Sequence, residues 1–199
     1  FKNNRVKTQF ISFPRYYTSF HGKHVGRFLV GEFGGNGEVS PYLSSLAFAL
    51  DRLTARDEIM DWLKEGNVVI ADRYVSASMA HQASKLPKSK RKAFIDWLYS
   101  MEYKEHKLPK EDIVIYLYVP VEVSQKLISK KEGRKYSEGK DKAEADIEHQ
   151  RKSIEMYSQL AEKFKHWEMV SCVDEHGELL SKRAVHTKIL EVLKKRKVV

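Results

Sequence analysis

Residues 67–74, NVVIADRY, decide the fold class of this chain. Val68 to Ala71 form a continuous apolar run of strand length, which is typical of a strand covered on both faces. Asp72 and Arg73 follow at its carboxyl end, the edge where open α/β sheets bind their ligands. DIVIYLYV at residues 112–119 has the same character. The two runs therefore predict buried strands of a parallel sheet.

Segments with a helical apolar period separate these strands from each other and from two further ones. Residues 5–13 and 167–173 are rich in β-branched and aromatic residues and predict the further strands. Helices are predicted over residues 17–31, 41–63, 76–86, 88–105, 121–129, 144–164 and 178–195. This alternation favours right-handed crossovers. We predict that residues 1–199 form a single α/β domain, a doubly wound parallel sheet with helices on both faces.

The composition restricts the classes of function. With 199 residues, 42% of them apolar, the chain can build the core of one domain. A net charge of +9 favours a polyanionic partner, phosphate first of all. Cys172 is the single cysteine, which excludes an internal disulfide and fits a reducing, cytosolic compartment. The apolar runs are too short to span a membrane, and no dedicated nucleic-acid motif is present.

Three arginines and one aromatic side chain are expected to meet where the strands end. Arg15 follows the first predicted strand, and Arg73 follows the second. Phe48 and Arg52 lie one turn apart on the helix between them. A guanidinium makes forked hydrogen bonds to phosphate, and an aromatic face stacks on a nucleobase. The set predicts a site for a small nucleotide.

Each of these side chains also has a purely structural alternative. Phe48 alone is equally typical of the core face of a helix. Arg52 and Asp51 could form a solvated charge ladder with Arg56 on the helix surface. Asp72 and Arg73 could be an ion pair at the end of a strand.

Taken together, these segments resemble the thymidylate kinase family. The resemblance runs from SFPRY at residues 12–16 through SPYLSSLAFALDR at 40–52 and GNVVIADRYVSASMAHQ at 66–82 to GRKYSEGK at 133–140. It implies a P-loop nucleoside monophosphate kinase fold. It further implies phosphoryl transfer from ATP to dTMP, giving dTDP, with Mg²⁺, in a cytoplasmic homodimer.

Position by position, the resemblance implies roles in catalysis and substrate binding. Arg15 would hold the dTMP phosphate, and Arg73 would neutralise it. Phe48 would stack on thymine, while Arg52 would donate a hydrogen bond to a thymine carbonyl. Asp72 would organise the magnesium and phosphate region, through water where it meets the metal, or would bind the sugar hydroxyl.

The remaining implied residues lie beside the base and sugar and in a lid. Ser78, His81 and Gln82 would line the base and sugar side of the substrate. Arg134 and its lysine neighbours would close over the ATP phosphates as part of a lid loop at residues 130–142. The rival interpretation of that basic loop is a solvated segment or a nucleic-acid patch.

The chain departs from the family pattern at the phosphate loop. No segment reads G-x-x-x-x-G-K-[ST], because Gly22-Lys23-His24 and Gly139-Lys140-Asp141 lack the required hydroxyl. In the family this loop follows a central strand. Since a strand–helix–strand unit takes about 30 residues or more, we expect about 30 residues ahead of Phe1 in the complete protein. Without them we expect a gap in the sheet and no activity.

Two other functions remain open at this stage. The chain could be a dTMP-binding regulatory or partner subunit that has no phosphoryl-transfer activity. It could also belong to a kinase for another nucleotide or for a deoxynucleoside, because Ser78 and Phe48 do not by themselves distinguish thymine from uracil.

Overall fold

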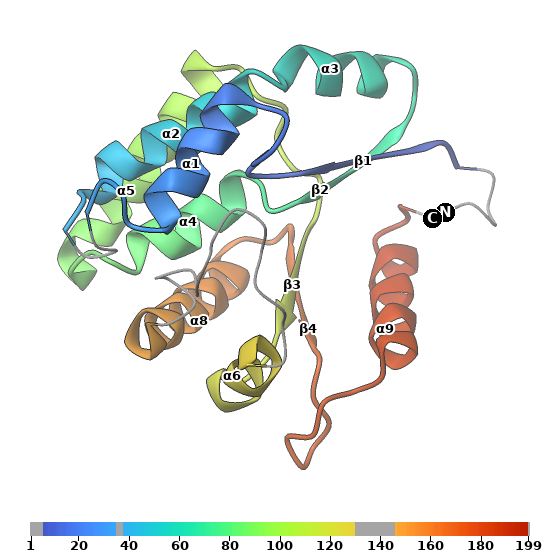
Figure 1. Cartoon of the computed structure of the whole chain (residues 1–199). Coiled ribbons are helices and arrows are strands. Elements are labelled where there is room, and N and C mark those ends of the chain that lie inside the picture. Colours follow the sequence, from blue (N-terminus) through green and yellow to red (C-terminus); the bar gives the residue numbers. More distant parts are fainter. Residues whose placement is uncertain (1–5, 35–37, 130–145, 199) are drawn as a thin grey trace.

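The computed structural model describes residues 6–34, 38–129 and 146–198 (Figure 1). Its strands are β1 (Thr8–Ser12), β2 (Val68–Asp72), β3 (Val114–Tyr118) and β4 (Trp167–Ser171). Its helices are α1 (Phe20–Leu29), α2 (Pro41–Leu53), α3 (Arg56–Lys64), α4 (Val75–Ala83), α5 (Lys88–Tyr99), the π-helix η2 (Ser100–Glu105), α6 (Val121–Ser129), α8 (Ile147–Lys163) and α9 (Lys182–Lys195). The predicted lid and Arg134 lie outside the described residues.

The described strands form two parallel pairs. β1 pairs with β2, with Phe10 opposite Ile70, and β3 pairs with β4, with Tyr116 opposite Met169. The two pairs are not hydrogen-bonded to each other within the described residues. In Figure 1 α4 and α8 lie on one side of the strands and α9 lies on the other. The parallel α/β prediction is therefore confirmed, and so is the expected gap in the sheet.

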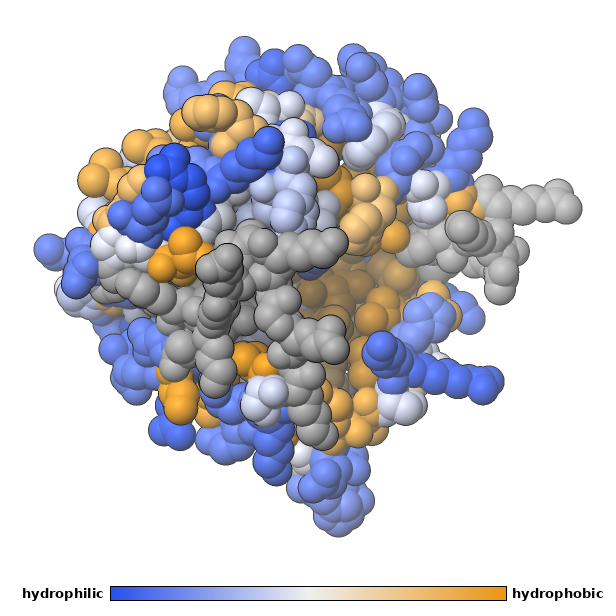
Figure 2. Space-filling view, viewed as in Figure 1, coloured by the Kyte–Doolittle hydropathy of each residue, from blue (hydrophilic) through white to orange (hydrophobic). Residues whose placement is uncertain are grey.

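A surface hollow accompanies this gap. Four strand side chains are exposed although they are large and apolar: Phe10, Ile70, Leu117 and Met169. Figure 2, viewed as in Figure 1, shows an apolar hollow beside the strands, toward α9. Strands of a doubly wound sheet are normally covered on both faces. This face is thus unusually open for the fold.

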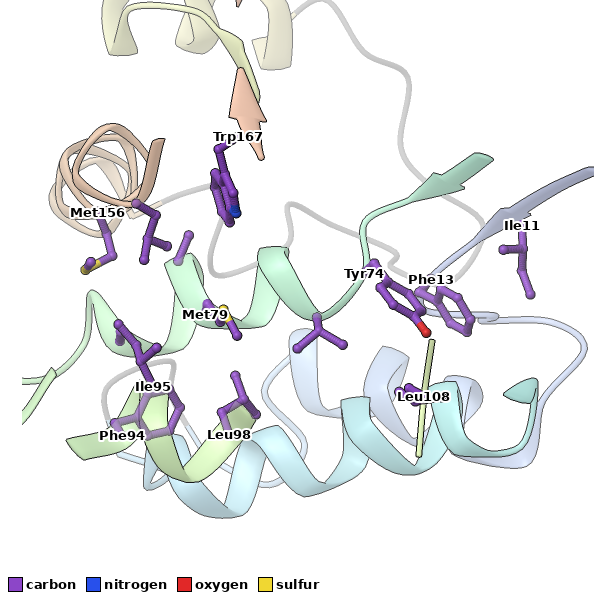
Figure 3. Close-up of a cluster of buried hydrophobic side chains, with 14 of the residues drawn as sticks. Ile11, Phe13, Tyr74, Met79, Phe94, Ile95, Leu98, Leu108, Met156 and Trp167 are labelled. Atoms are coloured by element: carbon purple, nitrogen blue, oxygen red, sulfur yellow. The ribbon is translucent and has the colours of Figure 1, made fainter. Parts of the chain in front are cut away.

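The core lies on the opposite side of the strands, where the helices are packed. Phe13, directly after β1, packs against Tyr74 with ring centroids 5.9 Å apart. Ile11 of β1, Met79 of α4 and Phe94 of α5 belong to the same cluster (Figure 3). α4 is central, since it packs against α2, α5 and α8. The helical apolar period of these segments accounts for this arrangement, because it gives each helix one apolar face to bury.

The prediction of one continuous helix over residues 41–63 is wrong, because the structure has two helices there, α2 and α3. The cause is a competing hydrogen bond. The Asp51 carbonyl accepts from Arg15 Nη2 at 2.7 Å and from the Thr54 hydroxyl at 2.9 Å. The Ala55 N–H instead donates to the Arg52 carbonyl at 3.0 Å, a tighter turn that ends α2.

Helix α1 packs so closely on the turn after β1 that only glycine fits at position 22. A Cβ on Gly22 would lie 2.3 Å from the Arg15 carbonyl oxygen. We expect Gly22→Ala to lower the free energy of unfolding by at least about 2 kcal/mol, because this clash outweighs the ~1 kcal/mol that alanine gains in a helix.

Urea denaturation followed by circular dichroism measures this change. Lys23→Ala, at an exposed position of the same helix, is the control and should be nearly neutral. A Gly22→Ala chain as stable as the wild type would contradict the close packing of α1.

Candidate functional site

A cavity of about 290 Å³ opens at the carboxyl ends of the paired strands β1 and β2. The turn after β1 forms one wall, and α1, α2, α4, α6 and α8 form the others. This is the carboxyl-end location at which parallel α/β sheets bind ligands. The cavity lies at the edge of the sheet where the sequence predicts the site.

Most of the predicted site residues meet in this cavity. Its lining includes six of them: Phe48, Arg52, Arg73, Ser78, His81 and Gln82. In the sequence these residues are up to 34 positions apart, from Phe48 to Gln82, yet they line one cavity. The reason is the topology, which sets α2 and α4 side by side.

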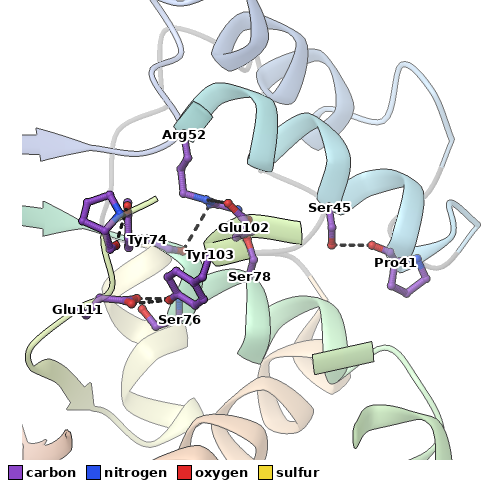
Figure 4. Close-up of polar contacts among 10 residues, drawn as sticks. Pro41, Ser45, Arg52, Tyr74, Ser76, Ser78, Glu102, Tyr103 and Glu111 are labelled. Carbon is purple, nitrogen blue, oxygen red and sulfur yellow. Dashed lines mark hydrogen bonds and ion pairs between the residues drawn. The ribbon is translucent and has the colours of Figure 1, made fainter. Parts of the chain in front are cut away.

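A fully buried ion pair forms the base of the cavity. Arg52 is 2% exposed, and its Nε donates to Glu102 at 3.1 Å while its Nη2 also binds that carboxylate. Arg52 Nη2 donates to the Ser78 hydroxyl at 3.0 Å (Figure 4). Burial lowers the pKa of Arg52, but the Glu102 carboxylate outweighs this effect and raises the pKa above its usual value. Arg52 is therefore charged and held in place.

These contacts exclude the structural alternative of a solvated charge ladder. Asp51 and Arg52 are both buried, and each binds a residue far away in the sequence rather than Arg56. Glu102 was not found from the sequence, because nothing in the pattern of its π-helix marks it as the partner of Arg52.

Arg73 is exposed, whereas Arg52 is buried. It follows β2 with a φ of +59°, in the left-handed region that side chains other than glycine rarely adopt. Its side chain is exposed and lines the cavity, and it makes no hydrogen bond or ion pair with the described residues. A strained backbone that presents an uncommitted guanidinium is characteristic of a ligand-binding position.

An aromatic surface faces the cavity from α1 and α2. Phe48 is half-buried, and the edge of the Phe28 ring lies against it with centroids 6.4 Å apart. This packing fixes the Phe48 ring while leaving it in the cavity wall. Both the core alternative and the stacking prediction for Phe48 are compatible with this position.

The structure directs Arg15 away from the cavity. Its Nε donates to Asp51 at 3.2 Å and its Nη2 binds the Thr54 hydroxyl. Arg15 is absent from the cavity wall, where its neighbour Tyr16 is found instead. The resemblance assigns this guanidinium to the dTMP phosphate, whereas in the structure the buried Asp51 binds it at the α2–α3 junction.

Asp72 also lies outside the cavity wall. Its carboxylate accepts a hydrogen bond from the Ser12 hydroxyl at 3.0 Å, across the carboxyl ends of β1 and β2. Within the described residues, no three His, Cys, Asp or Glu side chains come together to hold a metal ion.

Two histidines that face each other complete the wall. His81 from α4 and His149 from α8 have ring centroids 5.8 Å apart. Burial, followed by the positive charge of Arg73, lowers the pKa of His81 well below its usual value. Burial also lowers the pKa of His149 to about 4. Both rings are therefore neutral at pH 7. His149 could not be assigned to the site from the sequence, because no motif marks it.

The fold and cavity define a nucleotide-binding α/β protein, with a guanidinium at the strand end and an aromatic ring in the wall. A family model described as thymidylate kinase matches residues 4–195. The chain belongs to the thymidylate kinase family. Its members phosphorylate dTMP to dTDP with ATP.

Among the described residues, no helix has the length and apolar character needed to cross a membrane.

Individual relatives agree with this assignment. A thymidylate kinase of Mycobacterium tuberculosis (strain CDC 1551 / Oshkosh) is 30% identical over 151 residues, 76% of this chain and 70% of that protein. A probable thymidylate kinase of Pyrobaculum aerophilum is 28% identical over 110 residues, 55% of this chain and 53% of that protein. The solved thymidylate kinase of Candida albicans has the same fold, with a TM-score of 0.70 and 23% identity over 96% of this chain and 80% of that one.

We expect Glu102→Ala to lower the free energy of unfolding by about 3–5 kcal/mol, because it leaves the Arg52 charge buried without a partner. Chemical denaturation measures the change. The matched control is Asp96→Ala, which removes an exposed carboxylate that pairs with Lys92 and should cost less than about 1 kcal/mol. Equal effects of the two substitutions would show that Arg52 does not depend on Glu102.

Proposed function

We propose that the cavity binds dTMP and presents its phosphate to the γ-phosphoryl group of ATP. The observation that carries this proposal is Arg73, an uncommitted guanidinium held by a strained backbone at the carboxyl end of β2. Its forked donors fit the acceptor phosphate and reduce the repulsion between the two reacting nucleotides. Arg15, which the resemblance assigns to that phosphate, instead fixes the turn that positions Tyr16 in the wall.

The hydrogen-bond donors around Arg52 fit the carbonyl groups of thymine. A guanidinium has five N–H donors. Arg52 uses four of them on Glu102, Tyr74 and Ser78, which leaves one on Nη1. The Ser78 hydroxyl accepts from Arg52 and keeps its own proton for a ligand. The base would stack on Phe48 beside these donors.

Gln82 also offers hydrogen-bond donors that fit the carbonyl groups of the base. Its side-chain oxygen accepts from the Ser44 hydroxyl at 2.9 Å, so the amide N–H₂ remains to donate. Thymine and uracil offer carbonyl oxygens to such donors, whereas cytosine presents an amino group at the corresponding position. The site thus favours thymine or uracil over cytosine, and a kinase for another nucleotide of the uracil type is the nearest alternative.

The donor side of the reaction needs groups beyond this cavity. We propose that Arg134 and the lid at residues 130–142 bind the ATP phosphates. Mg²⁺ would arrive with ATP, with Asp72 contacting it through water. The described residues supply the acceptor half of the site: they orient dTMP and stabilise charge on its phosphate.

We further propose that a parallel strand supplied from outside residues 1–199 lies between the two strand pairs and carries the phosphate loop. Two observations support this: the pairs share no hydrogen bond among the residues that the structure describes, and Ile70 and Leu117 are exposed. The chain by itself would then lack the group that holds the γ-phosphate in line.

A coupled ADP-release assay with dTMP compares residues 1–199 with a chain extended by such a strand, G-x-x-x-x-G-K-[ST] loop and helix. Only the extended chain should turn over and melt cooperatively. Robust turnover by residues 1–199 would exclude the proposed strand. A folded but inactive extended chain would instead favour the dTMP-binding regulatory subunit.

The homodimer and the cytoplasmic location are also part of the proposal. Leu43, Leu46 and Leu50 form an exposed apolar stripe along α2, at the spacing of one helix face. Such a stripe fits a second copy of the chain. The buried, unpaired Cys172 fits a reducing compartment.

We expect Arg73→Lys to lower kcat by at least about tenfold with little change in Tm, because lysine keeps the charge but loses the forked geometry. The measurement is steady-state kinetics on the active enzyme, together with a thermal melt. Arg27→Lys, at an exposed arginine paired with Glu32, is the control and should leave both unchanged. Near-normal turnover by Arg73→Lys would remove Arg73 from the phosphate site.

A further inference from the structure

Arg73 joins β2 to α4 through a strained turn. Its φ of +59° lies in the left-handed region, which is costly for a residue with a Cβ and persists only where the neighbouring structure fixes it. On the strand side, the Asp72 carbonyl accepts a hydrogen bond from the Phe13 N–H at 2.9 Å. The conformation of Arg73 therefore depends on how firmly the other side of the turn, the start of α4, is held.

The cap at the start of α4 comes from a distant segment. Within the residues that the structure describes, the side chain of the N-cap residue, Tyr74, makes no capping hydrogen bond. The first N–H groups of a helix have no partner inside the helix. Glu111, shortly before β3, provides one, since its Oε1 accepts from the Ser76 N–H at 3.2 Å (Figure 4). The Tyr74 hydroxyl donates to the Pro109 carbonyl at 3.2 Å. Two contacts thus tie the start of α4 to one segment.

Glu111 is itself held in one orientation. Its other carboxylate oxygen, Oε2, binds the hydroxyl of Tyr103 from η2. Burial, followed by the Glu111 carboxylate, raises the pKa of Tyr103 above its usual value, so this hydroxyl keeps its proton and donates it. Both oxygens of Glu111 therefore have a partner. Glu111 does not line the cavity, so any effect on a ligand has to pass through α4 and Arg73.

A guanidinium binds phosphate best when it is already in place. An arginine that must first be ordered loses part of its binding free energy on association. Without the hydrogen bond from Ser76 to Glu111, the first turn of α4 can open, and Arg73 can return to a more favourable φ. Its guanidinium would then have to be ordered again by each ligand.

We propose that Glu111 is a positioning residue for the phosphate site. By capping α4 it holds Arg73 in the left-handed conformation that presents the guanidinium to the phosphate of the bound nucleotide. This rests on the proposed function, because it deepens the role of Arg73 in the same site.

Titration calorimetry on the full chain tests the proposal with dTMP and thymidine, which differ only in the phosphate. The ratio of their affinities is the phosphate preference. Glu111→Ala should lower this preference about tenfold, as expected for one hydrogen bond to a charged group, and should leave thymidine binding unchanged. Ser181→Ala is the matched control, because it removes the cap that accepts from the Ala184 N–H at 3.2 Å, on α9. It should retain the preference.

Two conservative variants separate reach from charge, and they keep the test decisive where Glu111→Ala impairs folding, which circular dichroism detects. Glu111→Gln keeps an oxygen that accepts from the Ser76 N–H and should retain the preference. Glu111→Asp keeps the charge but is too short to cap α4, and should lose it. In a chain that carries Arg73→Ala, Glu111→Ala should cause no further loss, because Glu111 acts through Arg73.

The proposal is overturned if Glu111→Ala and Glu111→Asp retain the phosphate preference while Arg73→Ala loses it. It is also overturned if Glu111→Ala weakens thymidine and dTMP equally, or if Ser181→Ala loses the preference to the same extent, since either result would indicate a merely structural role. A chain in which Arg73→Ala keeps the full preference, or a wild type that binds neither compound, would instead contradict the proposed function.

Discussion

The buried ion pair between Arg52 and Glu102 is the contact on which the rest of the site depends. Two charges removed from water are stable only when each has its partner and its remaining donors are satisfied. Here α2 supplies the guanidinium, η2 the carboxylate and α4 the Ser78 hydroxyl that accepts a further bond. The pair therefore fixes three elements relative to one another. The position of the cavity floor follows from that requirement.

The three arginines of the sequence pattern differ in the groups that they contact in the structure. Arg52 is almost fully committed to the protein and can contribute one donor to a ligand. Arg15 is held by the buried Asp51 and shapes the junction between α2 and α3. Arg73 alone of the three is uncommitted in the described part of the chain. Three side chains of equal charge thus have different environments, because their burial and their neighbouring carboxylates differ.

Most of the fold and many of the residues that line the cavity could be predicted from the sequence. The runs NVVIA and DIVIYLYV specify buried parallel strands, and Asp72 and Arg73 had to lie at a strand end. The break after Leu53 could not be predicted, because it depends on a guanidinium 36 positions away that takes the Asp51 carbonyl. The contact between Arg15 and Asp51 could not be predicted for the same reason, since a loop arginine gives no sign of its carboxylate.

The sequence by itself determined the strand and helix order, the family resemblance and the set of side chains at the strand ends, since all of these follow from local periodicity and short motifs. Only the tertiary structure decided which arginine stays free, that Glu102 anchors Arg52, and that His149 on α8 meets His81 on α4. These outcomes depend on which helices pack side by side. Long-range packing brings together groups whose hydrogen bonds and charges have no signature in either segment.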